Sequence, residues 1–313
     1  MMDERDPVRH GDEGLLDVLC VGHASYDLVF SVPHHPGPDE KIFAKGFTAC
    51  GGGPAANAAV TVARLGLRAA FGGYLGLDLY GEKHWNELAS EGICTRFIAR
   101  GPSPTPVSVV LVKPDGRRSL VNYKGGTQHT AAESIDFSAA TPKVMLFDGH
   151  EPLLSAPLAL RARAEGIATV LDAGSLHEGT RALMDRVDYL VCSEKFARQY
   201  VGRQDEQEAL CRLSEHSAAV VITLGERGLV WRRGDERGAL RAFSVTAVDT
   251  TGAGDAFHGA FAAGLAAGMA WGDILRYASA AGALCCTKMG ARAGLPFLEE
   301  IHSLLEQHPW RTD

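Results

Sequence analysis

The chain has 313 residues, of which 46 % are hydrophobic and 22 % are charged, a balance typical of a globular protein with a sizeable core. This composition excludes a disordered chain, a collagen-like repeat and a small disulfide-stabilised protein. With 31 Lys and Arg against 38 Asp and Glu, the net charge is −7. This charge argues against nucleic acid as a partner, because such binding depends on clustered basic residues.

The first 14 residues, MMDERDPVRHGDEG, are charged and lack the apolar stretch of a secretory signal. We expect a disordered lead-in over residues 1–14 and one domain over residues 15–313. The seven cysteines form no C-x-x-C pair, and their odd number indicates reduced thiols in a cytoplasmic protein. No run reaches the ~18 strongly apolar residues of a membrane span, so we expect no membrane association.

Short apolar runs rich in β-branched residues alternate with helical patterns along the chain. Strands are predicted at residues 16–21, 144–147, 168–171, 187–191 and 219–223, and helices at 155–165 and 205–217 among them. This alternation predicts an α/β fold with a doubly wound parallel sheet, covered by helices on both faces. Ligands bind such sheets at the carboxyl ends of the strands. Polar residues fall at these ends: Asp148, Asp172, Ser193, Glu194 and Thr223.

Two regions break the alternation. Apolar runs at 107–112 and 119–123 flank the sequence KPDG, which favours a tight turn between antiparallel strands. Residues 28–32 and 41–47 predict two more short strands around a loop rich in Pro and His. We therefore expect a small antiparallel β-sheet that forms a lid, from segments at about 25–48 and 105–124. The open edges of such a sheet would allow a homodimer through the lid.

The strongest functional signal is the segment DTTGAGDAFHG, residues 249–259. Apolar residues recur at every fourth position after its turn and predict a helix: Phe257, Phe261, Leu265 and Met269. Gly252 and Gly254 allow the backbone to turn sharply and to approach a ligand closely. The N–H groups of residues 253–255 then lack partners within the helix and, with the helix dipole, favour a bound anion. Asp255 either caps this helix or accepts a proton from a hydroxyl that attacks a phosphoryl group.

Weaker signals come from three other segments. In GGGPAANAA, residues 51–59, Pro54 suits the first position of a helix that ends near Gly66, and Asn57 can bond a hydroxyl without adding charge. Asp27 follows the first strand, where a carboxylate can accept hydrogen bonds from two neighbouring hydroxyls of a sugar. Asn122, at the end of the predicted hairpin, would contribute to the same site. The segment TLGERG, residues 223–228, closes another strand and would wrap phosphates with its backbone.

In this order and at these distances, the four segments resemble the motifs of the PfkB (ribokinase-like) family of carbohydrate kinases. The resemblance extends from about residue 16 to about residue 296, and residues 249–259 resemble the C-terminal signature of the family. It implies a ribokinase-like doubly wound sheet with a β-sheet lid, and ATP and a sugar that meet between them. It further implies an enzyme that transfers a phosphoryl group to an alcohol group.

The resemblance also assigns roles to individual residues. It implies Asp255 as the catalytic base and the backbone of Gly252, Ala253 and Gly254 as the anion hole. The implied sugar contacts are Asp27, Gly52, Gly53 and Asn57, joined by the candidates Asn122 and His150. The implied ATP contacts are Thr223, Gly225, Gly228, Ala283 and Gly290. Asp249 and Thr251 match positions that hold a monovalent cation, such as K⁺, in some members.

The chain departs from the family at the site that serves Mg²⁺. The frequent Asn-x-x-Glu pattern is replaced by Ser193-Glu194-Lys195-Phe196. Glu194 either takes over the magnesium role or is a carboxylate at the start of a helix.

The acceptor is expected to be a non-phosphorylated sugar, with a ketose preferred. Family members that act on sugar phosphates typically carry Lys where this chain has Gly53-Pro54. The motifs look most like the branch that includes sulfofructose kinase, which makes sulfofructose the second candidate. That branch has a sulfonate-binding Arg near His150, and a neutral His lacks its charged fork; a solvent-facing loop residue is the alternative for His150.

Two further functions stay open. A nucleoside kinase of the same fold would need an aromatic bed for the base, and only Tyr26, Phe30 and Tyr123 lie near the predicted sugar site. A sugar sensor without catalysis would normally lose the base or the glycines, and this chain keeps Gly252, Gly254 and Asp255.

Overall fold

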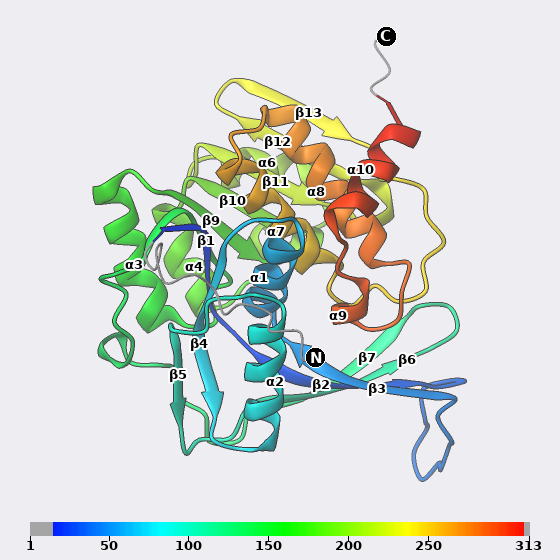
Figure 1. Cartoon of the computed structure of the whole chain (residues 1–313). Helices are drawn as coiled ribbons and strands as arrows, with labels where there is room; N and C mark the ends of the chain where they lie inside the picture. The colour runs from blue at the N-terminus through cyan, green and yellow to red at the C-terminus, as the bar shows by residue number, and fades with distance from the viewer. Residues whose placement is uncertain (1–14, 310–313) are drawn as a thin grey trace, which may run out of the picture.

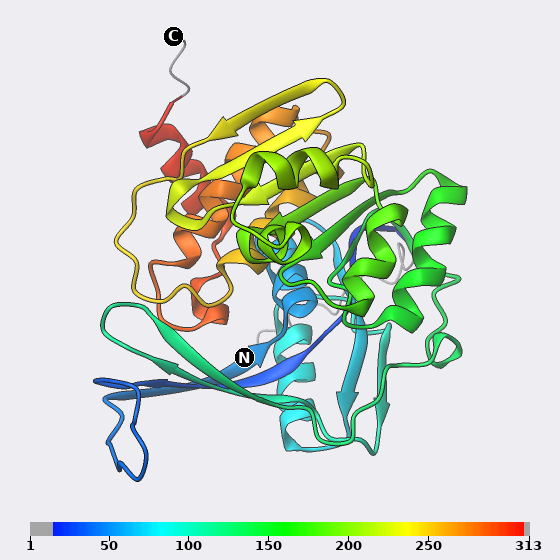
Figure 2. The same ribbon diagram turned by 180° about the vertical axis from the view of Figure 1, so that it is seen from behind.

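A nine-stranded sheet runs through the centre of the protein, and a four-stranded sheet projects from one end of it (Figures 1 and 2). The computed structural model describes residues 15–309. The predicted lead-in over residues 1–14 lies outside the described residues. Among residues 15–309, no helix is both long enough and apolar enough to span a membrane.

The large sheet has the strand order β13-β12-β11-β10-β9-β8-β1-β4-β5. Its strands are β1 (Leu15–Val21), β4 (Ala69–Gly76), β5 (Ile98–Gly101), β8 (Thr141–Phe147), β9 (Ala168–Ala173), β10 (Tyr189–Ser193), β11 (Ala219–Thr223), β12 (Leu229–Arg233) and β13 (Glu236–Leu240). All neighbours from β5 to β11 are parallel, as predicted. The hairpin of β12 and β13 adds an antiparallel edge that the sequence analysis did not predict, so the sheet is mixed.

Helices cover both faces of the large sheet (Figures 1 and 2). One face carries α1 (Pro54–Arg64), α7 (Ala253–Ala266), α8 (Trp271–Cys285) and α10 (Leu298–Gln307); the other carries α3 (Pro152–Glu165), α4 (Glu178–Leu183), α5 (Glu194–Val201) and α6 (Glu206–Leu213). Strand β1 shows how one apolar run serves both layers. Val18 and Cys20 enter the core under α1 and α7, whereas Leu19 and Val21 enter the opposite core. This alternation confirms the doubly wound architecture.

The smaller sheet is the predicted lid, with the strand order β3-β2-β6-β7. It consists of β2 (Ser25–Ser31), β3 (Gly46–Gly52), β6 (Val107–Val112) and β7 (Arg118–Tyr123). Strands β2 and β6 are parallel, so the lid is not purely antiparallel. Strand β3 begins at Gly46 and not at residue 41, because β2 ends at Ser31, the partner of Gly46. The predicted turn forms, with Gly116 at a φ of 74°.

Helix α2 (Leu79–Ser90) joins the lid to the body, since it packs against β4 as well as β2 and β3. The short helix α9 (Ala291–Gly294) lies beside β3. Helix α7 begins at Ala253 as predicted, but it ends at Ala266, because Gly268 takes a left-handed φ of 68°. Met269 therefore follows the helix instead of completing its apolar stripe.

Helices α1 and α7 approach each other closely because Gly259 has no side chain. A Cβ atom at Gly259 would lie 2.6 Å from the carbonyl oxygen of Ala58 and 2.7 Å from the Cβ of Thr61. This contact places the N-termini of both helices at the same edge of the sheet.

We expect Gly259→Ala to lower the free energy of unfolding by about 1–3 kcal/mol, the usual cost of extra volume in a packed core. Urea denaturation followed by circular dichroism measures it. Gly126→Ala is the matched control, because a Cβ there has nothing within 4 Å and should leave stability unchanged. Equal stability of the two variants would show that α1 and α7 are not closely packed at Gly259.

Candidate active site

The first turn of α7 lies at the carboxyl edge of the large sheet. Gly252 precedes the helix with a φ of 81°, a left-handed conformation that favours glycine. A Cβ at Gly252 would also lie 2.7 Å from the Cβ of Ala291. At Gly254, by contrast, a Cβ would have nothing within 4 Å, so open space adjoins the backbone N–H groups of this turn. The helix end therefore leaves room for the predicted anion, whose binding stays a prediction.

Asp255 lies in this turn and contacts the neighbouring helix. The Nδ2 atom of Asn57, in the first turn of α1, donates to Oδ2 of Asp255 at 2.7 Å. Burial raises the pKa of Asp255, while the Asn57 hydrogen bond and the charges of His258 and Arg118 lower it. A carboxylate with a raised pKa and one neutral donor is suited to accept a proton.

Asn57 is 2 % exposed, and its Oδ1 atom has no hydrogen-bond partner. Its Nδ2 atom must face Asp255, because a carboxylate only accepts hydrogen bonds. The buried Oδ1 atom is then left to accept from a ligand, since a buried polar atom without a partner is costly. A sugar hydroxyl that donates to this atom would lie beside Asp255.

The lid places Asp27 and Asn122 on the same row of the sheet. Asp27 pairs with Ser108 across β2 and β6, and Ser108 pairs with Asn122 across β6 and β7. Residues paired in this way point to one face of a sheet, so the two predicted sugar contacts share a face. Asp27 is buried, and Ser25 donates to its Oδ1 atom at 2.9 Å. Burial raises the pKa of Asp27, and the charge of Asp255 adds to this effect.

The two glycines before α1 allow the backbone to lie close to Asp27 and to His23. A Cβ at Gly52 would lie 2.2 Å from the Oδ2 atom of Asp27. Gly53 has a φ of 97°, and a Cβ there would lie 2.5 Å from the carbonyl oxygen of His23. Pro54 then opens α1, and Gly66 follows its end with a φ of 82°, as predicted.

Asp148, at the end of β8, holds three loops together. Its carboxylate accepts hydrogen bonds from the backbone N–H groups of His23 at 2.7 Å, Ala55 at 3.2 Å and His150 at 2.8 Å. The end of β1, the start of α1 and the loop after β8 are thereby fixed against one another.

His150 belongs to a row of three imidazoles. Its ring lies 5.5 Å from that of His23 and is stacked 4.7 Å from that of His177. A pocket of about 40 Å³ adjoins this row and is lined by His23, Lys124, His129, His150 and Glu151 among others. His150 therefore does not fit the alternative interpretation, that of a solvent-facing loop residue.

The predicted ATP contacts lie farther along the same edge. Thr223 ends β11, and its Oγ1 atom donates to the carbonyl oxygen of Cys192 at 3.3 Å. Gly225 and Gly228 take φ values of 60° and 93° in the turn that follows. Ala283 lies in the last turn of α8, and Gly290 precedes α9.

The predicted metal ligands belong to two separate sites, Glu194 for Mg²⁺ and Asp249 with Thr251 for a monovalent cation. Within residues 15–309, no three His, Cys, Asp or Glu side chains lie together. Asp249 is buried and bonds protein atoms with both oxygens: Oδ1 accepts from Thr251, and Oδ2 accepts from the N–H of Gly290. Asp249 thus ties the loop before α7 to the loop before α9.

Glu194 is also engaged by the protein. Its Oε1 atom accepts from Gln204 at 2.8 Å and forms an ion pair with Arg227 at 2.9 Å. It lies at the first position of α5, where a carboxylate favours the helix dipole. These contacts favour the role of a helix-start carboxylate over that of a magnesium ligand.

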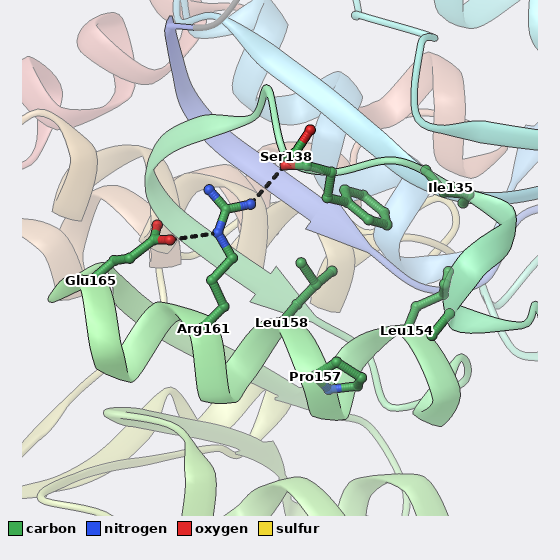
Figure 3. A pocket seen from close by; sticks show the side chains of 9 residues that line it. Ile135, Ser138, Leu154, Pro157, Leu158, Arg161 and Glu165 are labelled. Carbon is green, nitrogen blue, oxygen red and sulfur yellow. Dashed lines mark hydrogen bonds and ion pairs between the residues drawn. The ribbon is translucent and has the colours of Figure 1, made fainter.

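A pocket of about 460 Å³ lies elsewhere, between α3 and the segment before β8 (Figure 3). Arg161 crosses it and donates to the carbonyl oxygens of Phe137 and Ala140. None of the predicted site residues lines this pocket, and its arginine serves to hold the connection against α3.

Sequence reasoning did not assign a site role to Asp148, Asp172, His23, His258 or Arg292. Asp148 and Asp172 were recognised only as strand-end residues. Buried Arg292 reaches from α9 to Glu87 and His84 on α2, a contact that nothing in the sequence pattern indicates. His258 gave a signal that could have been used, because a polar residue stands one turn after Asp255 in an otherwise apolar helix.

Comparisons with known proteins cover almost the whole chain. Residues 15–298 match the model of the pfkB family of carbohydrate kinases. A ribokinase of Haemophilus influenzae is 30 % identical over 301 residues, which cover 92 % of this chain and 98 % of the relative. A ribokinase structure from Thermotoga maritima superposes with a TM-score of 0.82 at 26 % identity, over 93 % of this chain and 99 % of that one. An Arabidopsis thaliana ribokinase, solved with ribose and ATP, gives a TM-score of 0.82 at 25 % identity, over 93 % and 99 %.

We expect Gly254→Ala to reduce kcat by on the order of 10²-fold without loss of stability, the scale seen when stabilisation of a developing anion is disturbed. The added methyl group meets open space in the free protein and would meet only a bound anion. Steady-state kinetics and thermal melting measure the two effects. A variant with unchanged kcat, or one with a lowered melting temperature, would contradict the assigned anion site.

Proposed function

The chain belongs to the PfkB family of carbohydrate kinases and is a sugar kinase, and we propose that it transfers the γ-phosphoryl group of ATP to a primary hydroxyl of a non-phosphorylated sugar. The observation that carries this proposal is the hydrogen bond between Asn57 and Asp255 at two adjoining helix N-termini. It supports the proposal because Asp255, the unpartnered Oδ1 atom of Asn57 and the first turn of α7 lie together and suit a proton acceptor, a hydroxyl acceptor and an anion site. The related structure with ribose and ATP supports a sugar and ATP as the two substrates.

In this proposal, Asp255 accepts the proton of the attacking hydroxyl. Asn57 orients Asp255 with Nδ2 and the sugar with Oδ1. The N–H groups of the first turn of α7 stabilise the charge on the transferred phosphoryl group. Mg²⁺, when bound to ATP, would neutralise phosphate charge; Glu194, its predicted ligand, is paired with Arg227.

A ketose is the proposed acceptor, and sulfofructose is the second candidate. Gly53-Pro54 provides no cation for a sugar phosphate. The three imidazoles near Asp148 offer hydrogen bonds to the far end of a sugar. Burial lowers the pKa of His23 to about 4, with the charge of His150 adding to the effect, so this ring is neutral at pH 7. The neutral ring of His23 contributes no charge to bind a sulfonate, whereas the cationic side chain of Lys124 lines the same pocket.

A nucleoside is less well supported as the acceptor. Tyr26 is buried and stacks on Tyr80 at 5.1 Å, and Phe30 lies 4.9 Å from Phe47. The rings of Tyr26 and Phe30 therefore each already pack against another aromatic ring of the protein. Tyr123, on the exposed strand β7, is the remaining member of the expected aromatic bed.

The homodimer through the lid and the dependence on K⁺ stay predictions. The dimer is supported by two exposed apolar side chains of the edge strand β7, since Leu120 and Val121 are 46 % and 67 % exposed. For K⁺, both oxygens of Asp249 already bond the backbone or hydroxyl of the protein.

We expect Asp255→Asn to keep the fold and ATP binding but to reduce turnover by on the order of 10²–10⁴-fold, the usual contribution of a general base. In the unsubstituted protein, kcat/KM should fall as the pH drops through the pKa of Asp255, because the protonated carboxyl cannot accept a proton. Burial raises that pKa, so the fall should lie above the ordinary aspartate range. Near-normal turnover in the variant would remove Asp255 from the mechanism.

The acceptor is identified by measuring ADP release over ketoses, aldoses, sugar acids, sulfosugars and nucleosides, with Asp255→Asn as the inactive control. We expect a neutral ketose to give the highest kcat/KM. A kcat/KM for sulfofructose about tenfold above every neutral sugar would select the second candidate instead. An ATP-dependent melting shift with no turnover of any acceptor would show a sensor and overturn the proposed kinase function.

A further inference from the structure

His258 lies one turn after Asp255 on α7 and is 3 % exposed. Its ring joins the first turn of α7 to the ends of two strands. The Nδ1 atom lies 2.6 Å from the carbonyl oxygen of Gly254, and the Nε2 atom lies 3.1 Å from the carbonyl oxygen of Val191 on β10. Asp172, near the end of β9, brings its Oδ2 atom to 3.3 Å from Nδ1.

These contacts determine the protonation of the ring. Gly254 and Val191 offer carbonyl oxygens, which accept hydrogen bonds and never donate them. A neutral imidazole has one N–H, so its second nitrogen would direct a lone pair at a carbonyl oxygen. Only the imidazolium, with a hydrogen on each nitrogen, satisfies both contacts.

Asp172 supplies the countercharge that a buried imidazolium requires. Its carboxylate is itself buried, and a buried charge is stable only when it is paired. Burial raises the pKa of Asp172 to about 7, whereas the nearby charge of His258 lowers it. The other charged groups that act on Asp172 are Asp255 on α7 and Asp148 at the end of β8.

We propose that His258 is a positioning residue that, as an imidazolium paired with Asp172, fixes the first turn of α7 against the ends of β9 and β10. The same cation adds fixed positive charge behind the N–H groups that receive the phosphoryl group. This second consequence rests on the proposed kinase function, whereas the ion pair itself does not.

The protonation is tested by ¹⁵N nuclear magnetic resonance of the protein labelled at histidine. The His258 signals are assigned by their loss in His258→Gln. We expect both ring nitrogens of His258 to be protonated over about pH 7–8, where Asp172 can carry the countercharge and an unperturbed histidine is mostly neutral. An unprotonated ring nitrogen at pH 7 in the unsubstituted protein would overturn the ion pair, whatever the enzyme does with sugars.

Two variants test the positioning role. Asp172→Asn preserves shape but removes the countercharge, so His258 should lose one ring proton at pH 7. His258→Gln retains one donor without charge. We expect both to lower kcat by about 10–10²-fold, the effect of a small misplacement at a reacting centre, and to change the KM for ATP and sugar by less than about threefold. ADP binding and thermal melting establish that each variant is folded.

His216→Gln is the matched control, because His216 also contacts a carboxylate, Asp185 at 2.6 Å, but lies at the opposite end of the sheet, before β11. We expect its kcat to be unchanged. Folded Asp172 and His258 variants with normal kcat would overturn the positioning role, as would equal losses in the His216 control. If no acceptor is turned over by the unsubstituted protein, the kinase proposal fails, while the resonance experiment still decides the ion pair.

Discussion

The close approach of α1 and α7 is the constraint on which the site depends. Gly259 lets the two helices meet with backbone in contact, and the N-termini of both helices then open at the same edge of the sheet. Asn57 can reach Asp255 only because of this spacing. The first turn of α1 and the first turn of α7 therefore border the same space. A bulkier residue at the crossing would separate Asp255, the proposed proton acceptor, from Asn57. The packing between α1 and α7 thus determines how close the polar groups at their N-termini lie.

Glycines lie beside two carboxylates of the site because the backbone passes too close to these carboxylates for a side chain. A Cβ at Gly22 would overlap the carboxylate of Asp148, and one at Gly52 would overlap that of Asp27. Because glycine has no side chain, main-chain N–H groups can reach Asp148 from three directions. Hydrogen bonds of this kind hold a carboxylate without a cation. The three loops therefore keep fixed positions relative to one another.

The sequence predicted the features that depend on local pattern. The parallel strands, the glycine at the start of α7 and the proline at the start of α1 follow from periodicity and backbone chemistry. The edge hairpin of β12 and β13 was missed because its residues are half exposed and carry no continuous apolar run. The contacts of Asp148, Arg292 and His258 join segments far apart in the chain. Only the three-dimensional structure brings such partners together.

The carboxylates at this edge differ in how far hydrogen bonds and neighbouring charges offset the cost of burying them. Asp148 and Asp249 each accept several hydrogen bonds from the protein, and Asp172 has an imidazole beside it. Asp255 receives one neutral donor, the amide of Asn57, and burial raises its pKa. A carboxylate stabilised in this incomplete way gains most when it takes up a proton. Asp148 and Asp249 hold the loops around the site through their hydrogen bonds, and Asp255 is the carboxylate whose surroundings fit the proposed role of base.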